Sequence, residues 1–293
     1  MATVSEPVSL DYLVETTGAI RAAVETVIEG KSDVVRLAVT VLLAEGHLLL
    51  EDVPGVGKTM LAKALARSVD CTVRRIQFTP DLLPSDVTGV SVFDQEAREF
   101  EFKPGPVFAN LVVGDEINRA SPKTQSALLE AMEERQVTVD GVSRPLPDPF
   151  LVAATQNPVE YEGTYTLPEA QLDRFLMKLV LDLPPRDEEV EVLVRHAGGF
   201  DPRDLAAAGV RPVLTPAQLR EARAAVQQVQ AGPDVLGYVV DLVRGTRQAP
   251  SVQLGVSPRG ATALLAASRA WAWLRGAPAL TPDHVQDLSL IHI

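Results

Sequence analysis

The chain has 293 residues, of which 46% are hydrophobic and 23% charged, a composition typical of a globular protein with a buried core. Its formal net charge of −12 argues against non-specific nucleic-acid binding, which depends on lysine and arginine neutralising phosphates. Cys71 is the only cysteine, which excludes an internal disulfide and a zinc site built from cysteines. The sequence has neither a signal peptide nor an apolar run of about eighteen residues, so we expect a cytoplasmic protein without a membrane span.

The first part of the chain is predicted to be helical. After a loose tail at residues 1–9, apolar side chains recur with helical spacing over about 11–28 and 33–44. A short apolar run from Leu48 to Leu50 then has the character of a buried strand. His47 lies at the start of this strand, where we expect it to serve the structure rather than to bind a ligand.

The residues that follow this strand have the layout of a phosphate-binding loop. Proline and glycine lead into Lys58 and Thr59, which open a helix predicted over 58–69. In such a loop, backbone N–H groups surround a phosphate chain, and the helix N-terminus adds partial positive charge. We expect Lys58 to reach the β- and γ-phosphates and the Thr59 hydroxyl to bind Mg²⁺. The residues assigned to nucleotide binding are Asp52, Val53, Pro54, Gly55, Val56, Gly57, Lys58, Thr59 and Met60.

A second signal lies downstream and consists of two carboxylates. An apolar strand over about 110–116 ends in Asp115 and Glu116. Because ligands bind at the carboxyl ends of parallel strands, both side chains would face the phosphate loop. We assign Asp115 to Mg²⁺, directly or through water, and Glu116 to activation of the attacking water. An Asp-Glu pair is often only solvated surface, and Asp52 replaces the usual loop glycine, but the two motifs together predict an ATP or GTP site.

Two β-hairpins are predicted to interrupt the succession of strands and helices. The first pairs residues 90–93 with 99–102, and the second spans 136–143 around an Asp-Gly turn. Between the hairpins, Ser121 and Pro122 begin a helix that runs to about Arg135. The other elements predicted in this half are strands over 72–78, 150–155 and 179–182 and a helix over 169–178.

Two domains are predicted, with the boundary at the Pro-Pro pair at 184–185. Residues 1–19 form a tail and the start of the first helix, residues 20–183 an α/β nucleotide-binding domain, and residues 184–293 an all-helical domain. Because the last helix stops abruptly, we expect the C-terminal end to be truncated or non-native. Helices of the second domain are predicted over about 187–195, 216–230, 234–246, 259–275 and 282–289.

Several stretches together resemble the MoxR family of AAA+ ATPases. They are residues 49–59, 75–86, 114–132, 154–158 and 167–175. The resemblance covers roughly residues 20–288, and Asp52 is compatible with the loop of this family. It implies a P-loop AAA+ fold of class α/β, with a five-stranded parallel sheet between helices, two β-hairpin insertions and an all-helical lid. It also implies a ring, usually a hexamer, with ATP at each subunit interface.

The same resemblance assigns two residues that sense the phosphates. Asn157 matches a polar residue at a strand end that senses the γ-phosphate and orients the water. A turn asparagine before Pro158 is the alternative. Arg259 matches the second sensor, which contacts phosphate from the lid, and a solvated arginine on a helix is the alternative.

An arginine finger is the remaining catalytic group that the family resemblance implies. Such an arginine reaches into the neighbouring subunit's site and neutralises the charge that develops on the transferred phosphoryl group. Arg174 is the best candidate for this role, and Arg119 and Arg135 are its rivals.

The leading hypothesis is a Mg²⁺-dependent ATPase that acts as a ring on partner proteins. The resemblance implies chaperone-like remodelling, maturation or metal-cofactor insertion of a client protein, often alongside a protein with a von Willebrand factor A domain. A nucleic-acid motor or loader and a subunit like the magnesium chelatase motor are alternatives, and the acidic balance counts against the first. A non-catalytic nucleotide-binding scaffold is disfavoured because Glu116, Asn157 and Arg174 are all present.

Overall fold

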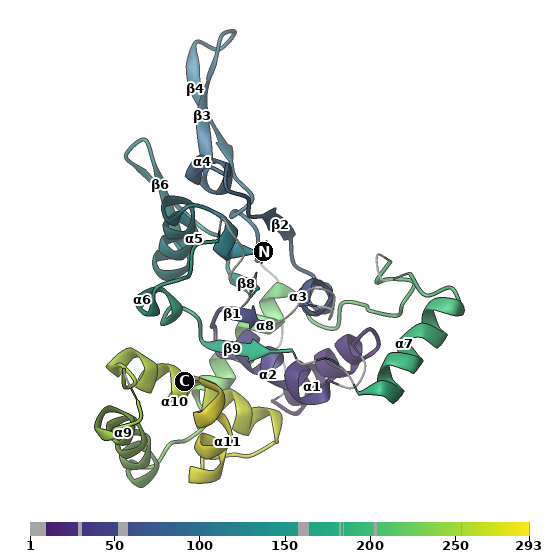
Figure 1. The fold of residues 1–293 in the computed structure, drawn as a ribbon, viewed down its shortest axis with the longest axis vertical. Helices are drawn as coiled ribbons and strands as arrows, with labels where there is room; N and C mark the ends of the chain where they lie inside the picture. The colour runs from purple at the N-terminus through teal and green to yellow at the C-terminus, as the bar shows by residue number, and fades with distance from the viewer. Residues whose placement is uncertain are drawn as a thin grey trace, which may run out of the picture.

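The computed structural model has at its centre a parallel sheet of five strands in the order β2-β5-β8-β1-β9 (Figure 1). The strands are β1 (Leu48–Glu51), β2 (Val73–Gln77), β5 (Leu111–Asp115), β8 (Leu151–Gln156) and β9 (Met177–Val180). The structure describes residues 10–28, 31–51, 58–157, 164–181, 183, 185–201, 204–252 and 254–292. Within these ranges, the side chains of Leu10, Leu13, Lys58, Thr59 and residues 290–292 are not described.

The strands run in one direction, so the sheet has two chemically different ends. Leu48, the first residue of β1, pairs with Met177, the first residue of β9, and Glu51 lies opposite Gln156 and Val180, where the three strands finish. We call the side where the strands begin the amino end of the sheet and the side where they finish the carboxyl end. Parallel strands carry ligands at their carboxyl ends, so the sequence predicts the site there.

The two faces of the sheet are covered by different helices, because side chains alternate along a strand. Leu48 and Leu50 belong to a larger core formed with α1 (Leu10–Glu25), α2 (Ser32–Leu43) and α3 (Lys58–Ser68). Leu49 belongs instead to a second core on the opposite face. That core contains residues of two further helices, α4 (Pro84–Thr88) and α5 (Pro122–Glu134).

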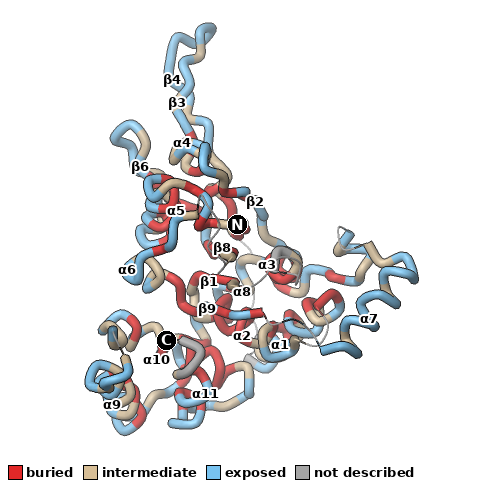
Figure 2. Tube along the Cα trace, viewed as in Figure 1, coloured by how far each residue is buried: buried red, intermediate tan, exposed pale blue. Residues whose placement is uncertain are grey.

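The C-terminal part is helical, as predicted, and shares the larger core. Buried apolar residues of α8, α10 and α11 join those of α1 and α2 in one continuous cluster. α7 differs, since none of its described residues is buried (Figure 2). The helices of this part are α7 (Arg186–Ala197), α8 (Pro216–Gln227), α9 (Pro233–Gln248), α10 (Pro258–Leu274) and α11 (Pro282–His292). No helix within the described part of the chain combines the length and apolar composition that a membrane span needs.

Both predicted hairpins are confirmed. One pairs β3 (Gly89–Asp94) with β4 (Glu99–Pro104), and it projects well away from the sheet (Figure 1). The other pairs β6 (Gln136–Val139) with β7 (Val142–Pro145). Its turn places Asp140 and Gly141 at φ 52° and 75°, the left-handed conformation that an Asp-Gly pair favours.

The prediction of a helix over 169–178 was wrong. The helix α6 spans only Glu169–Leu172, and β9 already begins at Met177, so Lys178 lies in a strand. The cause is tertiary pairing: the Leu176 N–H donates to the His47 carbonyl at 2.8 Å, and β9 then pairs along β1. The short helix α4 was not predicted either, because its residues stand among prolines.

Candidate nucleotide site

The carboxyl end of β1 leads into the predicted phosphate loop. Residues 52–57 lie outside the described residues, so the roles assigned to Asp52, Val53, Pro54, Gly55, Val56 and Gly57 stay predictions. The helix α3 begins at Lys58, as a phosphate loop requires, but the Lys58 and Thr59 side chains are likewise outside the description. Met60, in the first turn of α3, packs against the larger core and is half-buried.

Asp115 ends β5 as a buried carboxylate and is only 4% exposed. Its Oδ2 accepts from Nε of Arg75 at 2.5 Å, and its Oδ1 accepts from the Thr155 hydroxyl at 3.4 Å. Arg75 and Thr155 come from β2 and β8, the two strands that flank β5. A buried carboxylate at this place offers the hard oxygen ligands that Mg²⁺ prefers.

Glu116 leaves the strand in the left-handed conformation, with φ 57° and ψ 51°. Its N–H donates to the Thr155 hydroxyl at 3.0 Å. Its Oε2 accepts from Nε2 of Gln77 at 3.0 Å and pairs with Nη1 of Arg119 at 2.8 Å. The carboxylate is therefore held at the carboxyl end of the sheet while its side chain stays 41% exposed, an arrangement open to water and suited to a general base.

Asn157 directly follows β8, the strand between β5 and β1. On one side of β8 lies β5, which ends in Asp115, and on the other lies β1, whose end leads into the predicted phosphate loop. Its carbonyl accepts from Nδ2 of Asn118 at 3.1 Å. Beside it, Nε2 of Gln156 donates to Glu51 at 3.1 Å, and Glu51 pairs with Lys178 at 2.6 Å. The phosphate-sensing role of Asn157 stays a prediction.

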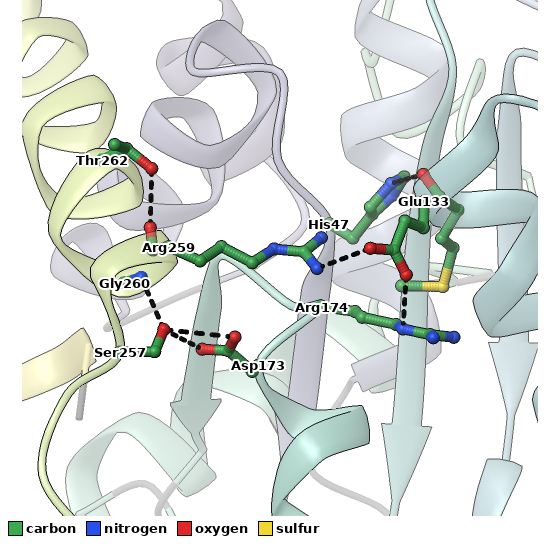
Figure 3. A network of polar contacts seen from close by, with 9 residues as sticks. His47, Glu133, Asp173, Arg174, Ser257, Arg259, Gly260 and Thr262 are labelled. Atoms are coloured by element: carbon green, nitrogen blue, oxygen red, sulfur yellow. Dashed lines mark hydrogen bonds and ion pairs between the residues drawn. The ribbon is translucent and has the colours of Figure 1, made fainter.

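The two predicted arginines lie at the amino end of the sheet, away from these carboxylates. Arg174 precedes β9, and its Nε pairs with Oε2 of Glu133 at 3.0 Å. Arg259, in the first turn of α10, pairs through Nη1 with Oε1 of the same Glu133 at 2.9 Å (Figure 3). The structure therefore brings Arg174 and Arg259 together but separates both from Asp115 and Glu116 by the length of the strands, at about 3.3 Å per residue.

The comparisons with known proteins agree with this architecture. Residues 47–177 match a family model described as ATPase family associated with various cellular activities (AAA), and residues 244–291 match an AAA lid domain. The chain is 41% identical to Chaperone MoxR1 of Mycobacterium tuberculosis, over 90% of this chain and 71% of that protein. The chain belongs to the MoxR family of AAA+ ATPases.

Other relatives of this MoxR-family ATPase agree in sequence and in fold. Protein YeaC of Bacillus subtilis is 54% identical over 91% of this chain and 82% of its own length. A crystal structure from Cytophaga hutchinsonii superposes with a TM-score of 0.87 at 36% identity, covering 97% of this chain and 87% of that chain. The AAA+ fold class and ATPase activity predicted from the sequence are thereby confirmed.

The rival candidates for the arginine finger occupy different places in the MoxR fold. Arg119 lies at the carboxyl end, paired with Glu116 of its own subunit. Arg135 lies at the amino end, where it pairs with Glu45 at 3.4 Å and donates to the Glu45 carbonyl at 3.1 Å. Of these three arginines, Arg174 alone pairs with a carboxylate that also pairs with a described arginine of the lid.

Buried His47 anchors the amino end, and the expectation of a structural role fits its contacts. Its Nδ1 accepts from the Val152 N–H at 3.0 Å, so its Nε2 carries the proton and donates to the Met132 carbonyl at 3.2 Å. Burial lowers the pKa of His47 to about 4. The neutral ring thus ties the end of α5 to the starts of β1 and β8.

The residues that hold the functional side chains were not predicted from the sequence. Arg75, Gln77 and Thr155 contact the two carboxylates, and Glu133 contacts the two arginines. For Gln77 and Thr155, a signal was present, because both lie at strand ends beside β5. For Glu133, no local signal exists, because it is one of several acidic residues on α5.

Proposed function

We propose that this ATPase hydrolyses ATP at the interfaces of a hexameric ring and uses the energy for chaperone-like work on a client protein. The observation that carries the proposal is the placement of Glu116 and Arg174 at opposite ends of one sheet. An arginine at the amino end does not reach the nucleotide of its own subunit, so it serves a neighbour. Contacts of this head-to-tail kind close into rings when the rotation between subunits allows it.

The donor set at the carboxyl end fits Mg²⁺. Buried Asp115 would supply oxygen ligands there, and Thr59, which the sequence assigns to Mg²⁺, would add a hydroxyl. When bound, Mg²⁺ would neutralise charge on the phosphate oxygens. The loop residues 52–57, with Lys58 and the backbone at Met60, would surround the phosphate chain.

The proposed catalytic roles follow from the positions of the side chains. Glu116 accepts a proton from the attacking water, and Asn157 orients that water. Arg174 of a neighbouring subunit neutralises the charge that develops on the γ-phosphoryl group. Arg259 shares the position of Arg174 at Glu133, so we propose that it contacts the phosphates of the same neighbour.

The client-directed part of the proposal rests on the relatives and the family resemblance. A relative 41% identical to this chain is named a chaperone. We accordingly propose remodelling or maturation of a client protein in the cytoplasm, including insertion of a metal cofactor, alongside a protein with a von Willebrand factor A domain. The β3–β4 hairpin offers a surface for such contacts, because Phe93 and Phe100 on it are exposed.

The test is ATP hydrolysis measured against protein concentration, with light scattering on the same samples. Activity per subunit is expected to rise with concentration in step with a ring-sized species. Arg174→Ala is expected to bind ATP and to lose about 10³-fold or more in turnover, the range known for arginine fingers. Arg135→Ala, at the same end of the sheet, tests a rival candidate for the finger and is expected to keep most of the activity. Activity that is flat with concentration and indifferent to Arg174 would mean a monomeric enzyme.

A further inference from the structure

We propose that Glu133 is a positioning residue for ATP hydrolysis in the neighbouring subunit. It holds the Arg174 guanidinium at the amino end of the sheet and couples it to Arg259 of the lid helix α10. This inference rests on the proposed function, in which Arg174 acts on a neighbour's nucleotide.

The geometry of the pair leaves the reactive part of Arg174 available. Glu133 engages Nε of Arg174 through Oε2 at 3.0 Å, and no described residue bonds to the two terminal nitrogens of this arginine. Those nitrogens form the fork that recognises phosphate oxygens. The carboxylate therefore fixes the direction of the guanidinium through Nε and leaves its two terminal nitrogens available for phosphate.

One carboxylate serves both arginines. Oε1 of Glu133 pairs with Arg259 while Oε2 pairs with Arg174, and the Glu133 side chain lies between the two guanidinium groups (Figure 3). A second link lies next to the first, because the Ser257 hydroxyl donates to the Asp173 carboxylate at 3.2 and 3.3 Å. The start of α10 is thus attached both to Glu133 and to the residue before Arg174. A movement of the lid therefore changes the position of the finger.

The helix that carries Glu133 is firmly placed but electrostatically unfavourable. The carbonyl of Met132, the residue before Glu133, accepts a hydrogen bond from buried His47. The last turns of α5 contain Glu130, Glu133 and Glu134 and no basic residue, although the C-terminus of a helix favours positive charge. Arg174 and Arg259 compensate this negative charge from outside the helix. We therefore infer that the acidic residues at the end of α5 serve to hold the two arginines.

Loss of Glu133 would leave Arg174 with competing partners. A cavity of about 440 Å³ lies beside Arg174, and Glu130 and Glu134 also line it. Without Glu133, the guanidinium can turn toward these two carboxylates and away from the subunit surface. We therefore expect slower hydrolysis with unchanged nucleotide binding.

The test uses mixed subunits. Glu133→Gln, nearly isosteric, is expected to lose about 10- to 100-fold in kcat, with the KM for ATP and the ring size unchanged. Added Glu116→Gln subunits, which keep an intact amino end but cannot hydrolyse ATP, are expected to restore part of this loss. Glu130→Gln is the matched control, since Glu130 lies one turn earlier, lines the same cavity and makes no ion pair with a described residue. It is expected to keep full activity.

Two further variants separate this inference from the proposed function. Arg174→Ala mixed with Glu116→Gln tests trans action itself and is expected to regain activity. Arg259→Ala removes the lid contact of Glu133 together with the proposed phosphate contact. Added Glu116→Gln subunits are expected to restore part of its loss as well, because both contacts serve the neighbouring subunit.

Three outcomes overturn the inference. If Arg174→Ala is rescued but Glu133→Gln is as active as wild type, the inference fails and the proposed function stands. If Arg174→Ala is rescued but an impaired Glu133→Gln is not restored by Glu116→Gln subunits, Glu133 acts within its own subunit. The inference then fails and the proposed function stands. If Arg174→Ala is unimpaired, or impaired without rescue, the trans mechanism fails together with the inference.

Discussion

The two ends of the central sheet differ in how their charged groups are held. At the carboxyl end, Asp115 is 4% exposed and contacts the strands on both sides. At the amino end, the side chains of Arg174 and Arg259 are 27% and 45% exposed, and a single glutamate holds both. The carboxyl end is thus assembled within one subunit, whereas the amino end presents charge at a surface that a neighbour can cover. In the proposed ring, this difference separates the part of the site that one subunit builds from the part that a neighbour supplies.

A large effect is expected at the carboxyl end. Glu116→Gln removes the proposed base and should lower turnover by about 10²- to 10⁴-fold, while ATP still binds. Single-turnover hydrolysis and equilibrium ATP binding on the same protein measure the two effects separately. Glu51→Gln is the control at the same end, because Glu51 pairs with Lys178 and has no proposed role in the proton transfer. Undiminished hydrolysis in Glu116→Gln would refute the assignment of the base.

A smaller effect is expected from the anchor of the amino end. His47 has a pKa of about 4 in the folded protein, lowered by burial from an ordinary value of 6.5. Between these two pH values the unfolded chain binds a proton that the folded chain does not bind. Stability is therefore lost as the pH falls from about 6.5 toward 4, by about 2 kcal/mol between pH 7.5 and pH 5.

Chemical denaturation at the two pH values measures this loss. His47→Gln lacks the titrating ring, so its free energy of unfolding should fall by about 2 kcal/mol less than that of wild type between pH 7.5 and pH 5. His196→Gln, at an exposed histidine of α7, is the control and should behave as wild type does. If the free energy of unfolding depends on pH equally in wild type and His47→Gln, the titration of His47 does not contribute to the loss of stability.

The smallest effect is expected for the arginine at the carboxyl end. Arg119 pairs with Glu116, but both side chains are about half exposed, at 48% and 41%. Ion pairs of this exposure contribute about 0.2–1 kcal/mol, so Arg119→Ala should change turnover by less than about tenfold. The measurement is kcat at saturating ATP. A loss of about 10³-fold that Glu116→Gln subunits restore would instead make Arg119 the finger and break the contrast between the two ends.

Much of the carboxyl end could be predicted because its signals are local. The apolar run before Asp115 predicts a buried strand, and a strand end in a parallel sheet predicts a ligand-facing carboxylate. The Asp-Gly turn of the β6–β7 hairpin is equally local, since the left-handed conformation is a property of those residues. In each case, the information lies within a few residues.

The amino end could not be predicted in the same way. Met177 and Lys178, the first residues of β9, were predicted to lie in a helix, because no local sequence pattern indicates that they pair with β1. The pairing of Glu133 with Arg259 spans 126 residues of chain, and no pattern within α5 or α10 indicates it. The sequence could offer three arginines as candidates for the finger, but not the end of the sheet at which each would lie.

The sequence by itself determined the two hairpins and the two carboxylates, because period, caps and turns act over short distances. Its resemblance to the MoxR family implied the AAA+ fold class. Only the tertiary structure decided that Arg174 and Arg259 share Glu133 and stand a strand's length from Glu116. The physical reason is that a parallel strand fixes which end of the sheet its neighbours in sequence occupy. Which residues from distant parts of the chain meet at one end of the sheet therefore depends on how the helices and the lid connect the strands. Local propensity does not encode these connections.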